Sequence, residues 1–185
     1  MPLEALPGAL ISLALFSTGD IVEILVERGW LAADPDLSAD PQLSAWLARA
    51  TELLGAQAYD RGSLGSLFAL VFNYDAAVIL SESASQGVLA REGSRDVIRE
   101  LANRVLEGGD IDSDGFKQII DKIKAAVPQR SRELFHPVRL ALAGRAGEGE
   151  LDRVILLLDS AAKLPFAVRV KSTRQRMMEF CAALD

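Results

Sequence analysis

Apolar residues recur three and four positions apart along almost the whole chain, and hardly any stretch alternates strictly between apolar and polar residues. This spacing places a stripe on a helix with about 3.6 residues per turn, whereas a half-buried strand alternates with period two. The sequence therefore predicts an all-α fold. Because 50% of its 185 residues are hydrophobic and 25% are charged, the chain can bury a core without disulfides or metal.

Five segments combine this periodicity with start and stop signals. The first has Asp40 or Ser38 as its expected N-cap and Pro41 in its first turn, where proline is tolerated. Ser94 is the expected N-cap of the second segment, and Ser172 or Thr173 that of the last. The predicted helices are "SADPQLSAWLARATELLGAQ", "SRDVIRELANRVLEGGD", "DGFKQIIDKIKAAV", "GELDRVILLLDSAAK" and "STRQRMMEFCAAL".

The stretch "DIDSDGFKQIID" (residues 110–121) matches the first half of an EF-hand calcium loop, with three aspartates and a glycine in register. Its second half departs from that pattern. Lys117 stands where the loop needs an apolar anchor, and Asp121 stands where a glutamate would chelate the ion. Aspartates before a helix also accept its free backbone N–H groups, so we interpret them as a helix cap and predict no metal site.

Features of composition suggest a cytoplasmic protein without a membrane segment. The single Cys181 excludes an internal disulfide framework and fits a reducing compartment. The apolar run "ALISLALF" (residues 9–16) is too short to span a bilayer, which takes about 20 residues, and is interpreted as a buried helix. Glu4 stands where a signal peptide would carry positive charge.

Charge is unevenly distributed along the chain. The formal net charge is −6, yet from Asp121 onward there are twelve Lys or Arg residues against eight Asp or Glu residues. The first 120 residues hold eight against eighteen. A polyanion would therefore meet the C-terminal part of the chain.

The segment "RELFHPVRLALAGRAGEGELDRVILLLD" (residues 132–159) resembles the C-terminal anticodon-binding region of bacterial glutamyl-tRNA synthetases. The residues that match the family's core pattern are Leu134, Phe135, Pro137, Arg139, Ala141, Leu142 and Gly144. Upstream, Gly55 and Gln57 stand where the family has basic residues. The resemblance implies a bundle of two small helical subdomains, residues 1–90 and 91–185, like the helix cage of the synthetases.

The resemblance also implies an RNA contact at Arg139, which matches an arginine that contacts the anticodon loop in the family. We interpret Pro137 as a rigid turn before it; the alternative is that Arg139 caps helix carbonyls or pairs with Glu133. His136 either stacks on a base or is a solvated surface group. The remaining predicted contacts form a basic strip that would bind phosphates: Arg130, Arg132, Arg145 and Lys124, with Lys122 beside them.

No catalytic residue or cofactor is predicted. A chain with one histidine cannot contain the His-x-Gly-His motif of the class I synthetases, and none of its five lysines lies in a Lys-Met-Ser-Lys loop. The resulting hypothesis is a stand-alone, non-catalytic module that binds tRNA near the anticodon. The alternative is a protein-interaction domain that has lost RNA binding and docks on a partner, such as a separately encoded catalytic subunit. A positive strip through Arg130, Arg132, Arg139 and Arg145 would favour the first, and an exposed apolar patch the second.

Overall fold

The computed structural model describes residues 15–185, which form ten α-helices and contain no strand. The all-α prediction is confirmed. The helices are α1 (Thr18–Glu27), α2 (Pro41–Gly55), α3 (Arg61–Phe72), α4 (Ala76–Ser81), α5 (Ser83–Leu89), α6 (Ser94–Glu107), α7 (Ser113–Ala126), α8 (Arg132–Ala143), α9 (Glu150–Ala161) and α10 (Thr173–Leu184).

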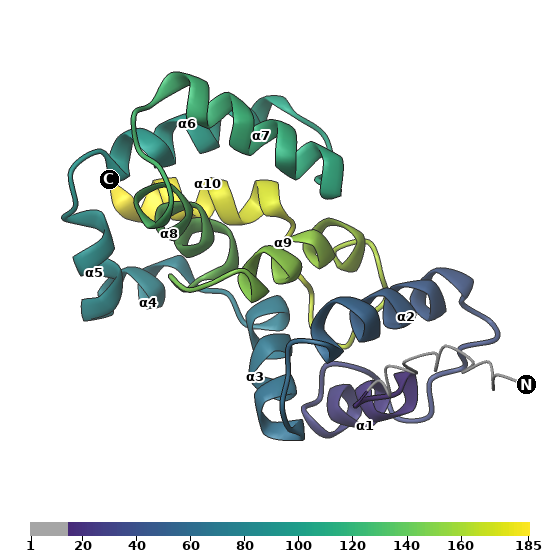
Figure 1. Ribbon diagram of the computed structural model, residues 1–185. Coiled ribbons are helices and arrows are strands. Elements are labelled where there is room, and N and C mark those ends of the chain that lie inside the picture. The colour runs from purple at the N-terminus through teal and green to yellow at the C-terminus, as the bar shows by residue number, and fades with distance from the viewer. Residues whose placement is uncertain (1–14) are drawn as a thin grey trace, which may run out of the picture.

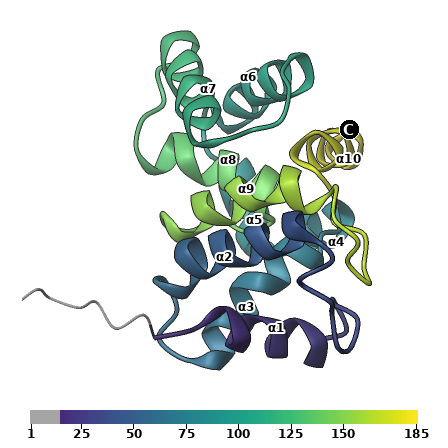
Figure 2. The same ribbon diagram turned by 90° about the vertical axis from the view of Figure 1, so that its right-hand side faces the viewer.

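Figures 1 and 2 show α6 and α7 at one end of the molecule, α1 and α3 at the other, and α8 and α9 between them. Helix α9 packs against α2 and α3 on one side and against α8 on the other, while α10 packs against α4, α6 and α8. Helices α4 and α5 thus lie with the C-terminal helices, so contacts cross the expected boundary near residue 90. That boundary stays a prediction.

Most of the expected helix caps are present. Asp40 caps α2 by accepting from the backbone N–H groups of Gln42 and Leu43, and Ser172 caps α10. Asp112 caps α7 by accepting from Gly115 N at 2.7 Å. These side chains satisfy backbone donors that have no partner within the helix.

The prediction that Ser94 caps α6 is wrong. The N-cap is Gly93, whose φ of 78° is in the left-handed region that glycine adopts without strain. Ser94 is instead the first residue of the helix. It is buried, and its hydroxyl donates to the carbonyl of Val88 at 2.7 Å, which ties α6 to the end of α5.

The expectation of a rigid turn at Pro137 is also wrong, because Pro137 lies inside α8. Proline lacks the N–H that would bond to Glu133 one turn earlier, which weakens the helix locally. Its ring is buried. The helix ends at Gly144 with φ 83°, where a Cβ would come within 3.0 Å of Ile79 Cδ1. Both the backbone angle and the close packing therefore require glycine at this position.

A buried guanidinium joins three chain segments at the centre of the molecule. Arg176 has an exposed fraction of 0% and donates to the carbonyls of Val71 at 2.7 Å, Leu142 at 2.9 Å and Lys171 at 3.2 Å. It also lies over the ring of Tyr74, 4.5 Å from the centroid. Burial lowers the pKa of Arg176 to about 10, so the group remains charged at neutral pH. It satisfies carbonyls at the ends of α3 and α8.

An aromatic cluster fastens α9 to the N-terminal helices. Trp46 of α2 donates its indole N–H to the carbonyl of Leu157 at 3.1 Å. Its ring lies edge-on to Phe166 at 5.0 Å, and Phe166 contacts Phe72 at 5.0 Å between centroids. Trp30 stacks on Phe72 at 4.9 Å between centroids. Pairs of this kind add to the stabilisation from buried apolar area.

The apolar run at residues 9–16 lies outside the described residues except for Leu15 and Phe16, which precede α1. Its interpretation as a buried helix stays a prediction. None of the helices described is long and apolar enough to cross a membrane.

Candidate nucleic-acid interface

Three surface hollows follow one another along α9. The first, the Tyr59 hollow of about 390 Å³, lies at the first turn of α9 and is lined by Gln57, Tyr59, Ser63, Ser66, Arg145 and Glu150. The second, the Phe135 groove of about 670 Å³, extends from Gly149 to Leu156. The third, the Trp46 cleft of about 450 Å³, extends from Leu156 to Leu164. Helix α9 therefore connects all three.

The Phe135 groove lies between α7, α8 and α9 and combines apolar and cationic side chains. Its apolar residues are Leu53, Phe116, Ile120, Phe135 and Leu156, its cations are Lys117, Lys124 and Arg153, and its anions are Asp121 and Asp152. Within the described residues, Lys117 and Arg153 form no ion pair, and Lys124 approaches Asp121 only to 3.9 Å. Positive charge thus remains available beside an aromatic surface.

Arg139 does not line this groove; it contacts two residues that do, Phe135 and Asp152, and its guanidinium is already occupied. It holds Asp152 through two parallel bonds, Nε–Oδ1 at 2.7 Å and Nη2–Oδ2 at 2.8 Å, and donates to the carbonyl of Gly147 at 2.7 Å. Its side chain is 8% exposed and lies 4.7 Å from the centroid of the Phe135 ring. This geometry favours a positioning role, since Arg139 joins α8 to α9 and fixes Phe135. A direct RNA contact by Arg139 stays a prediction.

His136 lies in α8 and is partly buried. Its Nδ1 lies 3.0 Å from Nη1 of Arg91. Because a guanidinium only donates, Nδ1 accepts and the ring is the neutral tautomer protonated at Nε2. Burial and the positive charge of Arg91 lower the pKa of His136. The ring is therefore neutral at physiological pH.

The other predicted basic residues differ in whether their side chains already have hydrogen-bond or ion-pair partners. Arg130 donates to the carbonyls of Val127 and Lys124 at 2.7 and 2.8 Å, which closes the C-terminal end of α7. Arg132 pairs with Glu148 at 3.4 Å on the surface. Arg145 is exposed and has no ion pair within the part of the chain that the structure describes. The expected strip is thus interrupted at the buried Arg139.

Two residues of the predicted set therefore stand beside open hollows: Lys124 in the Phe135 groove and Arg145 in the Tyr59 hollow. Sequence reasoning missed Arg153, and it noted Lys117 only as a misfit to a calcium loop. A usable signal for Lys117 and Lys124 was their spacing, because residues seven apart on a helix lie on one face.

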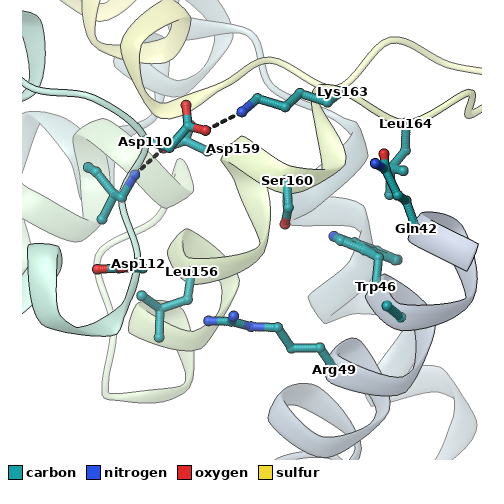
Figure 3. A pocket seen from close by; sticks show the side chains of 12 residues that line it. Gln42, Trp46, Arg49, Asp110, Asp112, Leu156, Asp159, Ser160, Lys163 and Leu164 are labelled. Atoms are coloured by element: carbon teal, nitrogen blue, oxygen red, sulfur yellow. Dashed lines mark hydrogen bonds and ion pairs between the residues drawn. The ribbon is translucent and has the colours of Figure 1, made fainter.

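Most charged groups of the Trp46 cleft bond to other parts of the fold, but Arg49 forms no ion pair within the described residues (Figure 3). Lys163 forms an ion pair with Asp110. The buried Asp159 accepts from Ile111 N at 2.7 Å, Thr173 N at 2.7 Å and the Thr173 hydroxyl. It thereby joins α9 to the α6–α7 loop and to the start of α10.

The aspartates of the predicted helix cap serve different partners. Asp112 caps α7, while Asp110 belongs to the ion pair with Lys163. Across residues 15–185, no group of three or more histidine, cysteine or acidic side chains is placed to hold a metal ion.

Comparison with known proteins gives one similarity of note. The chain is 29% identical over 119 residues to glutamate–tRNA ligase 2 of Syntrophus aciditrophicus (strain SB), which covers 61% of this chain and 23% of the ligase. The match thus spans less than a quarter of that ligase's length. It supports a region related to glutamyl-tRNA synthetases. No protein-family model matches the chain, and no solved structure matches it significantly.

Proposed function

We propose that this chain is a tRNA-binding module that contacts the anticodon region and has no catalytic activity of its own. The observation that carries the proposal is the Phe135 groove, in which two phenylalanines lie beside three cations that are not engaged in close ion pairs. The similarity to a glutamate–tRNA ligase selects tRNA among the nucleic acids that such a groove would suit.

The chemistry of the groove matches single-stranded RNA. Unstacked bases of RNA loops stack on aromatic side chains, and basic residues along the same groove neutralise the backbone phosphates. Phe135, which is partly buried, supplies the aromatic surface and the buried Phe116 lies beside it, while Lys117, Lys124 and Arg153 supply the charge. Arg139 contributes indirectly by holding Phe135 and Asp152. An anticodon loop presents bases of this kind together with closely spaced phosphates.

The absence of catalysis is proposed from the residues at hand. Adenylation by the class I family uses two histidines in its first motif, and this sequence contains one, His136, which is bonded to Arg91. Because the match covers 23% of the ligase, the activity of that ligase is not transferred to this chain.

Filter binding of purified protein to total tRNA across a salt series tests the proposal. Each phosphate contact contributes about 0.7 to 0.9 to the slope of log affinity against log salt. We expect steep salt dependence in the parent, and the variant Lys117→Ala/Lys124→Ala/Arg153→Ala should lower the slope by about two to three units. A matched control, Arg95→Ala/Arg99→Ala/Arg169→Ala, removes the same charge from α6 and the α9–α10 loop.

Either of two results would overturn the proposal. The parent protein could fail to bind tRNA at low salt, which would favour the protein-interaction alternative. The control triple variant could lose as much affinity as the groove variant, which would mean that net charge alone, and not the groove, attracts RNA.

A further inference from the structure

Tyr59 has its backbone held in place and its ring in solvent. Its exposed fraction is 81%, and it is the one exposed aromatic residue in the described part of the chain. It lies between α2 and α3, immediately before Asp60, the N-cap of α3. The backbone N–H groups of Tyr59 and Asp60 both donate to the hydroxyl of Ser63 at 3.1 Å. The backbone that carries the ring is therefore ordered before any ligand binds, which lowers the entropic cost of binding.

A single exposed aromatic residue is common on protein surfaces and has no meaning alone. Here, however, the ring shares the Tyr59 hollow with Arg145 and Gln57, which come from two different connections of the chain. Arg145 forms no ion pair within residues 15–185, and the amide of Gln57 has no side-chain hydrogen bond there. An aromatic face, an amide and a guanidinium thus converge on one hollow.

We propose that the Tyr59 hollow binds one unstacked nucleobase of single-stranded RNA. The base stacks on Tyr59, its polar edge bonds to the amide of Gln57, and the adjoining phosphate pairs with Arg145. These are the three interactions by which proteins recognise unpaired RNA bases. The inference rests on the proposed function and adds a second base-binding position to it.

The hollow is placed so that one RNA strand can reach both positions. Glu150 lines the Tyr59 hollow and its neighbour Gly149 lines the Phe135 groove, so only the first turn of α9 separates them. Glu150 is also the one unfavourable charge in the hollow for a phosphate. Its replacement, Glu150→Gln, should therefore raise RNA affinity by about twofold, the size of a weak surface interaction.

Three substitutions separate stacking from charge in the salt-series assay. Tyr59→Ala should weaken tRNA binding by about tenfold and leave the salt slope unchanged, because a stacking residue carries no charge. Tyr59→Phe keeps the ring and should bind within about twofold of the parent. Arg145→Ala should lower the slope by about one unit, as a phosphate contact does.

Fluorescence gives a second readout that loss of folding would not imitate. Trp30 and Trp46 are both buried, so Tyr59→Trp adds the one solvent-exposed indole of the described region. We expect an added oligouridine or tRNA to quench its emission and to protect it from acrylamide, as stacking on a base would.

The outcomes distinguish this inference from the proposed function. If the parent binds tRNA with steep salt dependence and Tyr59→Ala binds equally well, the inference is wrong and the proposed function stands. Unquenched emission from a Tyr59→Trp variant that retains parental affinity would also refute it. If the parent binds neither tRNA nor oligouridine, both proposals fail.

Discussion

The Trp46 cleft and the Phe135 groove meet at Leu156 and are both lined by α9, yet they differ in how their charges are engaged. In the cleft, Lys163 pairs with Asp110, and Asp159 accepts backbone and hydroxyl hydrogen bonds. In the groove, Lys117 and Arg153 form no ion pair within the described residues. The cleft holds segments of the chain together, whereas the groove has charge available for a ligand.

The number of charged residues in a hollow therefore does not show whether it is a binding surface. Both hollows contain acids and bases together with an aromatic side chain. What distinguishes them is how many cations already have a close partner in the fold: in the cleft Lys163 has one and Arg49 does not, whereas none of the three groove cations has one. A paired group loses a partner when a ligand arrives, while an unpaired one only exchanges water.

The largest effect is expected from a substitution that removes the hydrogen bonds of Asp159 in the Trp46 cleft. Asp159→Ala removes the acceptor of Ile111 N and of the Thr173 N–H and hydroxyl, leaving buried donors without partners. We expect the free energy of unfolding to fall by about 3 kcal/mol, as for a broken buried charged network. Urea denaturation measures it, and Ser160→Ala, at an exposed neighbour in the same cleft, should change it by less than about 0.5 kcal/mol.

If the Asp159→Ala variant stayed folded but no longer bound RNA, the structural role of the cleft and the binding role of the groove would not be independent. Binding should therefore be compared at a temperature where circular dichroism shows parental helix content. A loss of affinity there would contradict the purely structural role of the cleft.

The second-largest effect is expected at Arg139, whose side chain joins α8 to α9 and also holds Phe135 at the groove. Arg139→Ala leaves Asp152 without its two parallel bonds and Phe135 without its cation. We expect a loss of about 2 kcal/mol in the free energy of unfolding, reduced from the fully buried case because Asp152 is 25% exposed. Arg139→Lys should recover little, since an ammonium cannot reproduce the planar fork.

Arg132→Ala is the matched control for Arg139, because its pair with Glu148 lies on the surface and should contribute at most about 0.5 kcal/mol. If Arg139→Ala is as stable as the parent and loses discrimination among anticodons, Arg139 reads RNA directly. That outcome would restore the prediction made from the resemblance.

A smaller effect should distinguish single cations in the two hollows. Lys124→Ala in the groove should lower tRNA affinity by about 1 kcal/mol at low salt and the salt slope by about one unit. Arg49→Ala removes an equal, likewise unpaired charge from the cleft. It should change the slope by less than half a unit, because three aspartates (Asp110, Asp112 and Asp159) line the same cleft and would repel phosphates. Equal effects from the two variants in filter binding would show that the comparison of the hollows is mistaken.

The smallest effect is a pH dependence at α8. The pKa of His136 is lowered from 6.5 by burial and by Arg91, with Arg132 and Arg139 adding to the effect and Glu148 opposing it. As the pH falls below about 6.5, the unfolded chain takes up the proton first, so stability declines until the pH reaches the folded pKa. His136→Gln should flatten this part of a denaturation series between pH 7 and pH 5. The lowered pKa values of Asp20 and Asp36 act only below about 3.8, outside that window.

Much of the fold followed from the sequence because local signals agreed with packing. The helices found at α2, α6, α7, α9 and α10 follow apolar periodicity, and α2, α7 and α10 also have the side-chain caps that the sequence indicates. Helix α8 was not predicted because Pro137 is normally incompatible with a helix interior, and only burial of its ring among neighbouring helices overrides that preference. The cap at Gly93 was missed because a left-handed glycine has no side chain to signal it.

The candidate site was harder to predict because availability depends on partners distant in sequence. Arg139 was selected for its motif, but the Asp152 and Gly147 groups that engage it lie on another segment. Arg153 was overlooked because the sequence around it does not show whether its side chain has a partner in the fold. Phe135 is one of the residues that match the family's sequence pattern, but whether its ring faces a groove depends on how α7 packs.

The buried Arg176 has a consequence for the order in which the molecule can fold. Its acceptors on Val71 and Leu142 precede it by 105 and 34 residues, so the carbonyl ends of α3 and α8 receive their donor only when α10 docks. Contacts this far apart in sequence form late, after the entropy of closing long loops has been overcome. The hydrogen bonds of the central core can therefore be completed only when α10 is in place. This requirement couples the folding of the two ends of the molecule.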